Sequence, residues 1–404
     1  MIVAIFSVLV IFLLADFCLD KRWFSPLKIF NIVWLVVFGL YQLKLSYLQD
    51  DFTNTALWVF LICILTFDVV CITYNILIKH GQIRRFMAGQ KNRIFAWYKP
   101  KFDIDKKLKI VNLVFIGLFI IEIIYSKKIP LISLMAGGDS EYLKFGIPSL
   151  NGLMYGIAIC TGAYYIYKKN PRALIYILFG TLIVSRQLLI SMILEAIIVF
   201  GCRRIGSKHK IKHLPLKIMV VLVTFVMGFS LFGNFRSGDN TIQRVFEPRK
   251  GYENLPVPIM WLYSYTEFSF SNFNNLTKKT EGGVNHGASI ANALLPSAIT
   301  NNFKIEANFK KNYLVKPNFT VSTWFSEVYL DFGIIGVAIF SMLVALLGSI
   351  LYKNVLKSND IENSLLYALF LHNILMFFFI NMFLYLPVIS QIILIPILFR
   401  KKQE

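Results

Sequence analysis

Arginine is the residue type whose placement in this sequence points most directly to chemistry. Arg186 interrupts a nearly unbroken apolar run from Ala173 to Gly201, and Arg236 directly follows another apolar run. Guanidinium groups bind phosphate oxygens in pairs and stay charged in apolar surroundings. Two such groups around one cavity would suit a pyrophosphate, with Arg244 as a further contact. The alternative for Arg236 and Arg244 is an interfacial role, in which the charged end only reaches toward water or lipid head groups.

Three further titratable side chains are candidates for a reaction. His286 lies outside both the apolar runs and the basic loops, and imidazole titrates near neutral pH, so it is a candidate general base. A solvated loop histidine is the alternative. Glu327 and Asp331 are four residues apart at the start of an apolar run and therefore share one helical face. Carboxylates there are costly unless they pair with arginine or face a polar cavity. For Asp331, a structural pair with Arg186 or Arg236 and a direct substrate contact stay equally open.

Signatures of soluble nucleotide-dependent or metal-dependent enzymes do not occur in the sequence. It contains no phosphate-binding Walker loop, no glycine-rich dinucleotide turn, no HExxH and no paired CxxC. The five cysteines lie within apolar runs or at their ends, in no spacing typical of a disulfide framework or a metal site. We therefore expect no cofactor and no metal, and a substrate that is activated elsewhere.

The composition is that of a membrane protein. Hydrophobic residues make up 56% of the 404 residues, and only 16% are charged, whereas a soluble domain carries about a quarter of charged residues. The net charge of +20 first suggests nucleic-acid binding. Much of this charge, however, sits in short connections between apolar runs, as in the cytoplasmic loops of membrane proteins. The charge therefore indicates membrane topology, and we expect no nucleic-acid partner.

The apolar runs predict an all-α polytopic membrane helix bundle of about eleven transmembrane helices. Several runs reach the ~20 residues that a helix needs to cross the hydrocarbon core. We expect a single membrane domain over 1–404. The predicted spans are 1–19, 27–48, 55–78, 108–126, 149–167, 172–185, 187–202, 217–233, 326–351, 364–383 and 387–400.

The basic residues of the loops predict the orientation. The segment 79–107 is dense in lysine and arginine and is expected in the cytoplasm. The N-terminus and the loop with Gln49, Asp50 and Asp51 are then external, as is the large loop 234–325. Within that loop, the aromatic stretch 258–273 predicts an amphipathic helix that lies on the bilayer or packs over the bundle.

Arg186 needs a special arrangement within this topology. A single helix through its apolar run would leave it near mid-bilayer, at a cost of about 2.5–3.5 kcal/mol on insertion scales. Two short helices that meet at an external turn avoid this cost and also keep both basic flanks inside. Arg186 would then line a polar cavity below the outer membrane surface.

Several local features, in this order, resemble the Wzy-type O-antigen and oligosaccharide repeat-unit polymerases of bacterial envelopes. The resemblance implies a bundle similar to GT-C-type glycosyltransferases, and it extends to hydropathy and loop placement over nearly the whole chain. The features are Ser185-Arg186 in a short hairpin, Gly233-Asn-Phe-Arg-Ser before the large loop, Trp261-Leu-Tyr-Ser-Tyr with Asn272 and Asn275 in that loop, and Asn318 to Thr323 before Asp331-Phe-Gly.

The resemblance implies a glycosyltransferase reaction on the outer face of the plasma (inner) membrane. A growing glycan on undecaprenyl pyrophosphate would be transferred to the non-reducing end of a new lipid-linked repeat unit, building O-antigen, part of lipopolysaccharide, or a related surface polysaccharide. The implied partners are the undecaprenyl-pyrophosphate-linked oligosaccharide, membrane lipid and a chain-length regulator. Arg186 and Arg236 would hold the pyrophosphate, and His286 would be the base. The aromatic loop would stack on sugar faces. The implied substrate contacts are Arg244, Tyr263, Tyr265, Asn272, Glu327 and Asp331.

Two other functions fit parts of the pattern. An O-antigen ligase uses the same lipid-linked donor but passes the glycan to a lipid A core. A lipid-linked oligosaccharide flippase also combines many spans with interior arginines. The long external loop and the lack of repeated halves argue against a transporter.

Overall fold

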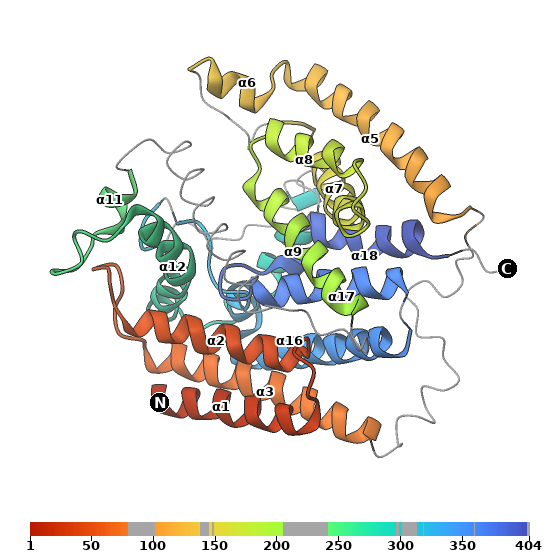
Figure 1. The fold of residues 1–404 in the computed structure, drawn as a ribbon. Coiled ribbons are helices and arrows are strands. Elements are labelled where there is room, and N and C mark those ends of the chain that lie inside the picture. Colours follow the sequence, from red (N-terminus) through yellow and green to blue (C-terminus); the bar gives the residue numbers. More distant parts are fainter. Residues whose placement is uncertain are drawn as a thin grey trace. The chain divides into compact units, whose positions relative to one another are not determined.

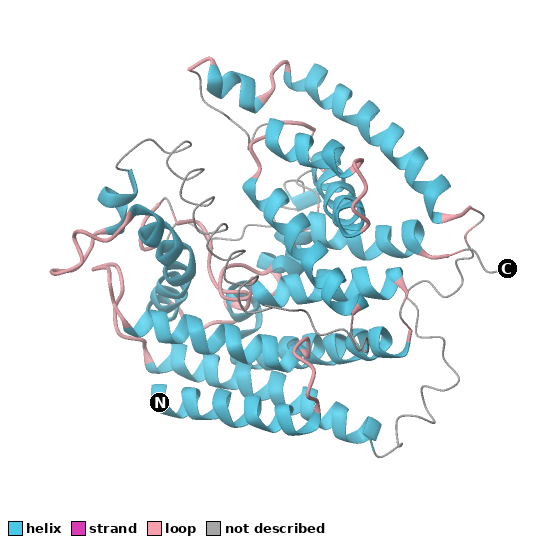
Figure 2. Ribbon diagram, viewed as in Figure 1, coloured by secondary structure: helices cyan, strands magenta, loops and turns pink. Residues whose placement is uncertain are grey.

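The structure is a computed structural model, and all regular structure in its described part is helical. The described residues form fourteen α-helices and one 3-10 helix, Met382–Leu384, and no sheet. Figure 1 and Figure 2 show how these helices run within each part of the chain. The described residues are 1–79, 100, 102–137, 145–147, 149–204, 241–295, 299–300, 313–317, 319–358 and 360–401. The helices are α1 (Ile2–Leu19), α2 (Pro26–Gln42), α3 (Asn54–Lys79), α5 (Ile104–Ser126), α6 (Pro130–Met135), α7 (Leu150–Tyr167), α8 (Ala173–Leu182), α9 (Arg186–Arg203), α11 (Thr241–Phe246), α12 (Val257–Lys279), α13 (Ala288–Leu294), α16 (Ser326–Lys357), α17 (Ile361–Leu375) and α18 (Leu386–Phe399).

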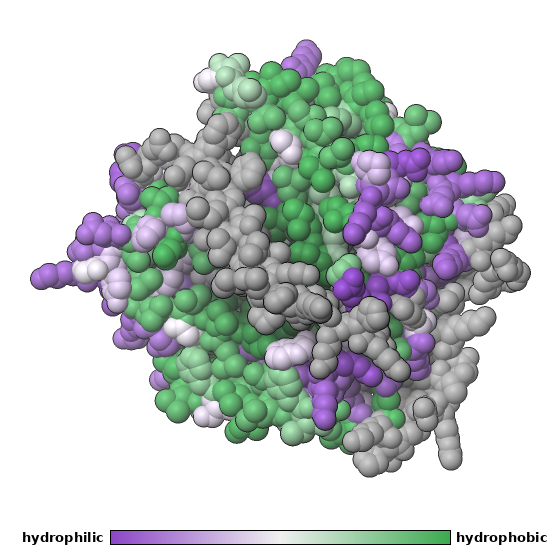
Figure 3. Space-filling model, in the orientation of Figure 1, coloured by the Kyte–Doolittle hydropathy of each residue, from purple (hydrophilic) through white to green (hydrophobic). Residues whose placement is uncertain are grey.

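Four of these helices are long and apolar enough to cross a membrane, which indicates a multi-pass membrane protein. They are α1, α3, α5 and α16, and three shorter apolar helices, α2, α8 and α18, accompany them. Large hydrophobic side chains are exposed on these helices, among them Leu113 with 75% and Ile335 with 74% exposure. Much of the visible surface in Figure 3 is hydrophobic. Such a surface is stable when lipid covers it.

Ten of the eleven predicted spans coincide with helices, and the span 217–233 lies outside the described residues. The prediction for 364–383 was too long, since α17 ends at Leu375. The backbone after it serves other contacts. The Phe377 carbonyl accepts from the Trp324 amide at 3.0 Å, and the Phe378 carbonyl accepts from the Ser269 hydroxyl. These bonds replace the helical ones that a longer α17 would make.

The chain forms two compact units. The first comprises Met1–Thr73, Gly206–Leu347 and Asn373–Met382. Its centre is aromatic: Trp34 of α2 stacks on Phe270 of α12 at 5.5 Å and on Phe325 at 6.1 Å. Aromatic pairs of this kind contribute about 0.5–1.5 kcal/mol beyond their buried area. They fix α12 against α2 within this unit.

The second unit comprises Tyr74–Ile205, Gly348–His372 and Phe383–Glu404. Its central helix α7 packs against α9 and α18. A buried polar chain joins α9 to α17, in which His372 contacts Ser191 through Nε2 and Glu195 through Nδ1, both at 3.1 Å. Buried polar groups are costly unless they find such partners.

The helix ends expected in the cytoplasm meet one another in the second unit. Lys107 near the start of α5 donates to the carbonyls of Ile397 and Arg400 at the end of α18. The Arg400 guanidinium in turn pairs with Glu362 at the start of α17. These contacts join the start of α5, the start of α17 and the end of α18.

Candidate functional site

The first unit holds a polar site around the loop 43–53, which joins α2 to α3. The predicted helix 27–48 was too long: α2 ends at Gln42, and Lys44 takes a positive φ of 46°. The sequence stays apolar beyond the end of α2 because the Leu45 side chain is buried in a cluster with Phe246 and Met260. Burial against segments about 200 residues away therefore ends the helix and turns the chain back over α12.

Arg249 fastens this loop through backbone groups. Its Nε donates to the Ser46 carbonyl at 3.1 Å, and its Nη2 donates to the Gln49 carbonyl at 2.6 Å. Its own amide donates to the Leu45 carbonyl at 2.9 Å. Hydrogen bonds from a charged donor are the stronger kind, so Arg249 holds the loop in one conformation.

Side chains on one face of α12 also bind the loop 43–53. The Tyr263 hydroxyl contacts the Leu45 amide, the Leu40 carbonyl and Gln49 Oε1. Asn274 donates to the Asp51 carbonyl at 2.9 Å and accepts from the Thr53 amide at 2.8 Å.

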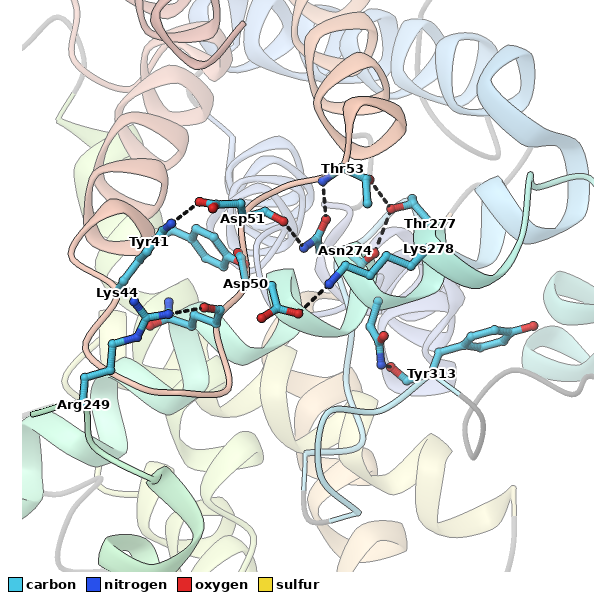
Figure 4. Close-up of polar contacts among 12 residues, drawn as sticks. Tyr41, Lys44, Asp50, Asp51, Thr53, Arg249, Asn274, Thr277, Lys278 and Tyr313 are labelled. Carbon is cyan, nitrogen blue, oxygen red and sulfur yellow. Dashed lines mark hydrogen bonds and ion pairs between the residues drawn. The ribbon is translucent and has the colours of Figure 1, made fainter.

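An ion pair lies next to the contacts between α12 and the loop 43–53. In Figure 4, Lys278 of α12 reaches Asp50 of the loop beside these contacts. The site therefore presents opposite charges side by side.

A cavity of about 250 Å³ opens beside this ion pair. It lies between the loop, α12 and the segment around Val315, and most of its lining is polar. Beyond the bonds already described, it offers a tyrosine ring, a serine hydroxyl, carboxylate and ammonium groups. Such a set of donors and acceptors suits a molecule rich in hydroxyl groups. The lining residues are Tyr47, Leu48, Asp50, Ser271, Asn274, Asn275, Lys278, Leu314 and Val315.

Charge and burial shift the titration of two groups in this site. The Lys44 ammonium beside Asp51 holds the pKa of that carboxyl below its usual value. Burial raises the pKa of the Tyr263 hydroxyl to about 12, which keeps it neutral and able to donate. Asp51 is therefore ionised at neutral pH, while the Tyr263 hydroxyl under the loop is neutral.

Arg186 lies in the second unit, at the break that its sequence predicts. The amides of Val184 and Ser185 close α8 by bonding to the carbonyls of Thr181 and Gly180. The Ser185 hydroxyl then accepts from the Leu188 amide and so caps α9, whose first residue is Arg186. Val184 carries a positive φ of 56°, a strained conformation for a β-branched residue. The chain thus maintains a strained break in front of the arginine.

His286 and Asp331, two predicted site residues, belong to segments that contact each other in the first unit. Gly333 breaks the helical path of α16 with a φ of 65°, and the Tyr329 and Leu330 carbonyls accept from the amides of Gly283 and Asn285.

The carboxylate of Asp331 accepts from the amides of Ser289 and Ile290, so it caps α13. His286 lies between these anchors, exposed, with a φ of 46°. Asp331 is thereby engaged by backbone.

The remaining predicted site residues have different surroundings. Asn272 is buried and fastens the cavity wall, since it donates to the carbonyls of Phe319 and Val321 and accepts from the Val315 amide. Tyr265 is half-buried and stacks on Trp261 at 6.0 Å. Arg244 is exposed on α11, and Glu327 is half-buried in the first turn of α16. Arg236 lies outside the described residues.

Several residues of the cavity were absent from the sequence prediction. Tyr47, Asn274 and Lys278 belong to no recognised motif, and Asp50 served only to orient the loop. Arg249, which fastens the loop outside the cavity lining, was not predicted either. Within the described ranges, no group of three or more histidine, cysteine, aspartate or glutamate side chains is placed to hold a metal ion.

No protein-family model, no curated protein and no solved structure matches this chain. Its function must therefore be inferred from its own residues.

Proposed function

We propose that the chain is a membrane-embedded glycosyltransferase that polymerises undecaprenyl-pyrophosphate-linked oligosaccharide repeat units on the outer face of the plasma membrane. The observation that carries the proposal is the polar cavity beside the Asp50–Lys278 pair. It is formed by two segments that the predicted topology places outside, the loop 43–53 and the loop 234–325. A lipid-linked glycan on the outer leaflet would present its hydroxyl groups at this level.

A second observation, in the other unit, supports the same reaction. Arg186 begins α9 after a strained break in an apolar run. A fixed arginine at such a break suits the pyrophosphate of the donor, because its charge would stabilise the leaving group as the glycosidic bond forms. We expect Arg236 to assist it.

The first test is the lipid-linked glycan profile of a strain that lacks this chain, resolved by gel electrophoresis and mass spectrometry. A polymerase defect leaves single repeat units that reach the outer face and are capped onto their acceptor, with no ladder of longer chains. Accumulation of units on the inner leaflet would instead identify a flippase. Extended chains that remain on undecaprenyl pyrophosphate would identify a ligase.

Single substitutions then test the arginines. We expect Arg186→Ala and Arg236→Ala each to abolish the ladder while the protein stays in the membrane in normal amount. Lys250→Ala, at an exposed site beside Arg249, is the control and should restore the ladder fully. A normal ladder from either arginine variant would remove that residue from the mechanism.

A further inference from the structure

Five polar side chains of α12 form a continuous row, here called the polar stripe of α12. Tyr263, Glu267, Ser271, Asn274 and Lys278 follow one another at spacings of four, four, three and four residues, which places them on one helical face. Three of them bind the loop 43–53, as described above, and Ser271 lines the cavity. The stripe therefore has one end, at Ser271, Asn274 and Lys278, in the cavity lining, and its other end, at Tyr263, buried against the loop 43–53.

Glu267, in the middle of the stripe, is different from its neighbours. Its side chain is fully buried, and neither carboxyl oxygen has a hydrogen-bond partner among the described residues. Burial raises the pKa of Glu267 well above its usual range. A buried carboxyl without a hydrogen-bond partner is unfavourable for folding, and such a group suggests a chemical role.

Two tyrosine hydroxyls lie near Glu267, and Ser271 lies between Glu267 and the cavity-lining end of the stripe. Tyr41 of α2 and Tyr263 of α12 lie close enough to couple with it electrostatically, and Asp50 couples with Tyr41. Ser271 is four residues further along the same face, the spacing at which helical side chains meet. Its hydroxyl is part of the cavity wall and donates to the backbone carbonyl of Glu267 at 3.4 Å. A rotation of this hydroxyl toward the carboxyl would connect a bound hydroxyl group to Glu267.

We propose that Glu267 accepts, through the Ser271 hydroxyl, the proton of the sugar hydroxyl that is glycosylated. The inference rests on the proposed polymerase function and supplies its general base. The acceptor oxygen forms a bond to the anomeric carbon of the growing chain while the bond from that carbon to the pyrophosphate oxygen breaks. Undecaprenyl pyrophosphate leaves with the electron pair. The acceptor proton passes to Ser271, whose own proton passes to Glu267 and from there to solvent.

The test uses membrane vesicles that contain the full-length protein. The substrate is the lipid extract of the deletion strain, which holds the unpolymerised lipid-linked units, and chain elongation is measured from pH 4 to pH 9. Glu267→Gln should lower the rate about 10²–10⁴-fold, the usual contribution of a general base, with KM little changed. Ser271→Ala should also lower it, and Ser271→Thr, which keeps the hydroxyl, should restore it. Glu253→Gln, at an exposed site, is the matched control.

The pH profile separates a proton acceptor from a merely structural residue. The wild type should lose activity on acidification at a pH above the ordinary range of a glutamate carboxyl, because the protonated carboxyl accepts no proton. The residual activity of Glu267→Gln should lack this step. The inference is overturned by a wild-type rate in Glu267→Gln, by an unchanged acid step in that variant, or by full activity of Ser271→Ala. If Glu267→Gln fails to fold, the two Ser271 variants decide. Wild-type vesicles that elongate nothing refute the polymerase proposal itself.

Discussion

Arg249 offers the sharpest test of how the site is held together. Its guanidinium bonds the carbonyls of Ser46 and Gln49 at 3.1 and 2.6 Å. A hydrogen bond from a charged group contributes about 1.5–3 kcal/mol, and Arg249 is half-buried, so we take the lower value for each bond. Arg249→Ala should then reduce the free energy of opening of the loop 43–53 by about 3 kcal/mol, or roughly 100-fold in the opening equilibrium.

Hydrogen–deuterium exchange of the detergent-solubilised protein measures this effect directly. Amides of the loop 43–53 should exchange roughly 100-fold faster in Arg249→Ala, while amides of α7 keep their rates. Arg249→Lys should recover about half of the loss in free energy, because an ammonium replaces the forked guanidinium as a single point of contact. Lys250→Ala is the matched control, with a neighbouring exposed charge. Unchanged exchange in Arg249→Ala would refute the assignment of Arg249 as the fastening of the loop.

Three further predictions concern other contacts. Asp331→Ala should loosen α13 by about 1–2 kcal/mol, the usual cost of losing a helix cap, seen as faster exchange of its first amides; unchanged protection would exclude the cap. Glu195→Ala should destabilise the protein by about 1–3 kcal/mol in thermal unfolding, because the Nδ1 atom of His372 loses its buried hydrogen-bond partner while Nε2 keeps Ser191. The double variant Glu195→Leu, His372→Leu should lose less free energy of unfolding than Glu195→Ala. A larger loss from the double variant would contradict the pairing. The folded-state pKa of Asp51 lies below its ordinary value of 3.8, so its contribution to stability is present above that value and fades as the pH falls through the folded-state pKa. Since Asp51 is largely exposed, the contribution should stay under ~1 kcal/mol, and Lys44→Met should remove this pH dependence of loop exchange.

The helix break at Arg186 could be predicted because one residue conflicted with its surroundings. An arginine in the middle of an apolar run is too costly for a single helix, and Ser185 before it is a strong capping residue. The structure resolves the conflict locally, between Gly180 and Leu188. Local conflicts of this kind are visible in a sequence because they need no knowledge of distant partners.

The end of α2 could not be predicted in the same way. Leu45 and Leu48 continue the apolar pattern of the helix, and nothing near them signals a turn. What ends the helix is contact with Phe246, Arg249 and Tyr263, about 200 residues away. The contacts of Asp331 could not be predicted for a related reason: its carboxylate accepts from two backbone amides, and backbone donors have no side-chain signature.

The polar stripe of α12, by contrast, is visible in the sequence from its spacing, whereas its partners in the loop 43–53 are not. The sequence left open whether α12 lies on the bilayer or packs over the bundle. A helix on a membrane surface would turn its polar side to water. In α12, however, Ser264, Ser269 and Asn272 are buried together with Phe270 and Phe273.

A helix that buries both its polar and its aromatic faces must be packed within the protein, so the second alternative holds in the first unit. Most polar groups of the stripe are already matched by the loop 43–53, and the cavity beside them therefore exists before any ligand binds. Binding to a preformed site requires little ordering of side chains. Glu267 is the member of the stripe that this packing leaves without a partner among the described residues. The proposed role as proton acceptor would give a chemical purpose to a buried carboxyl that costs folding free energy.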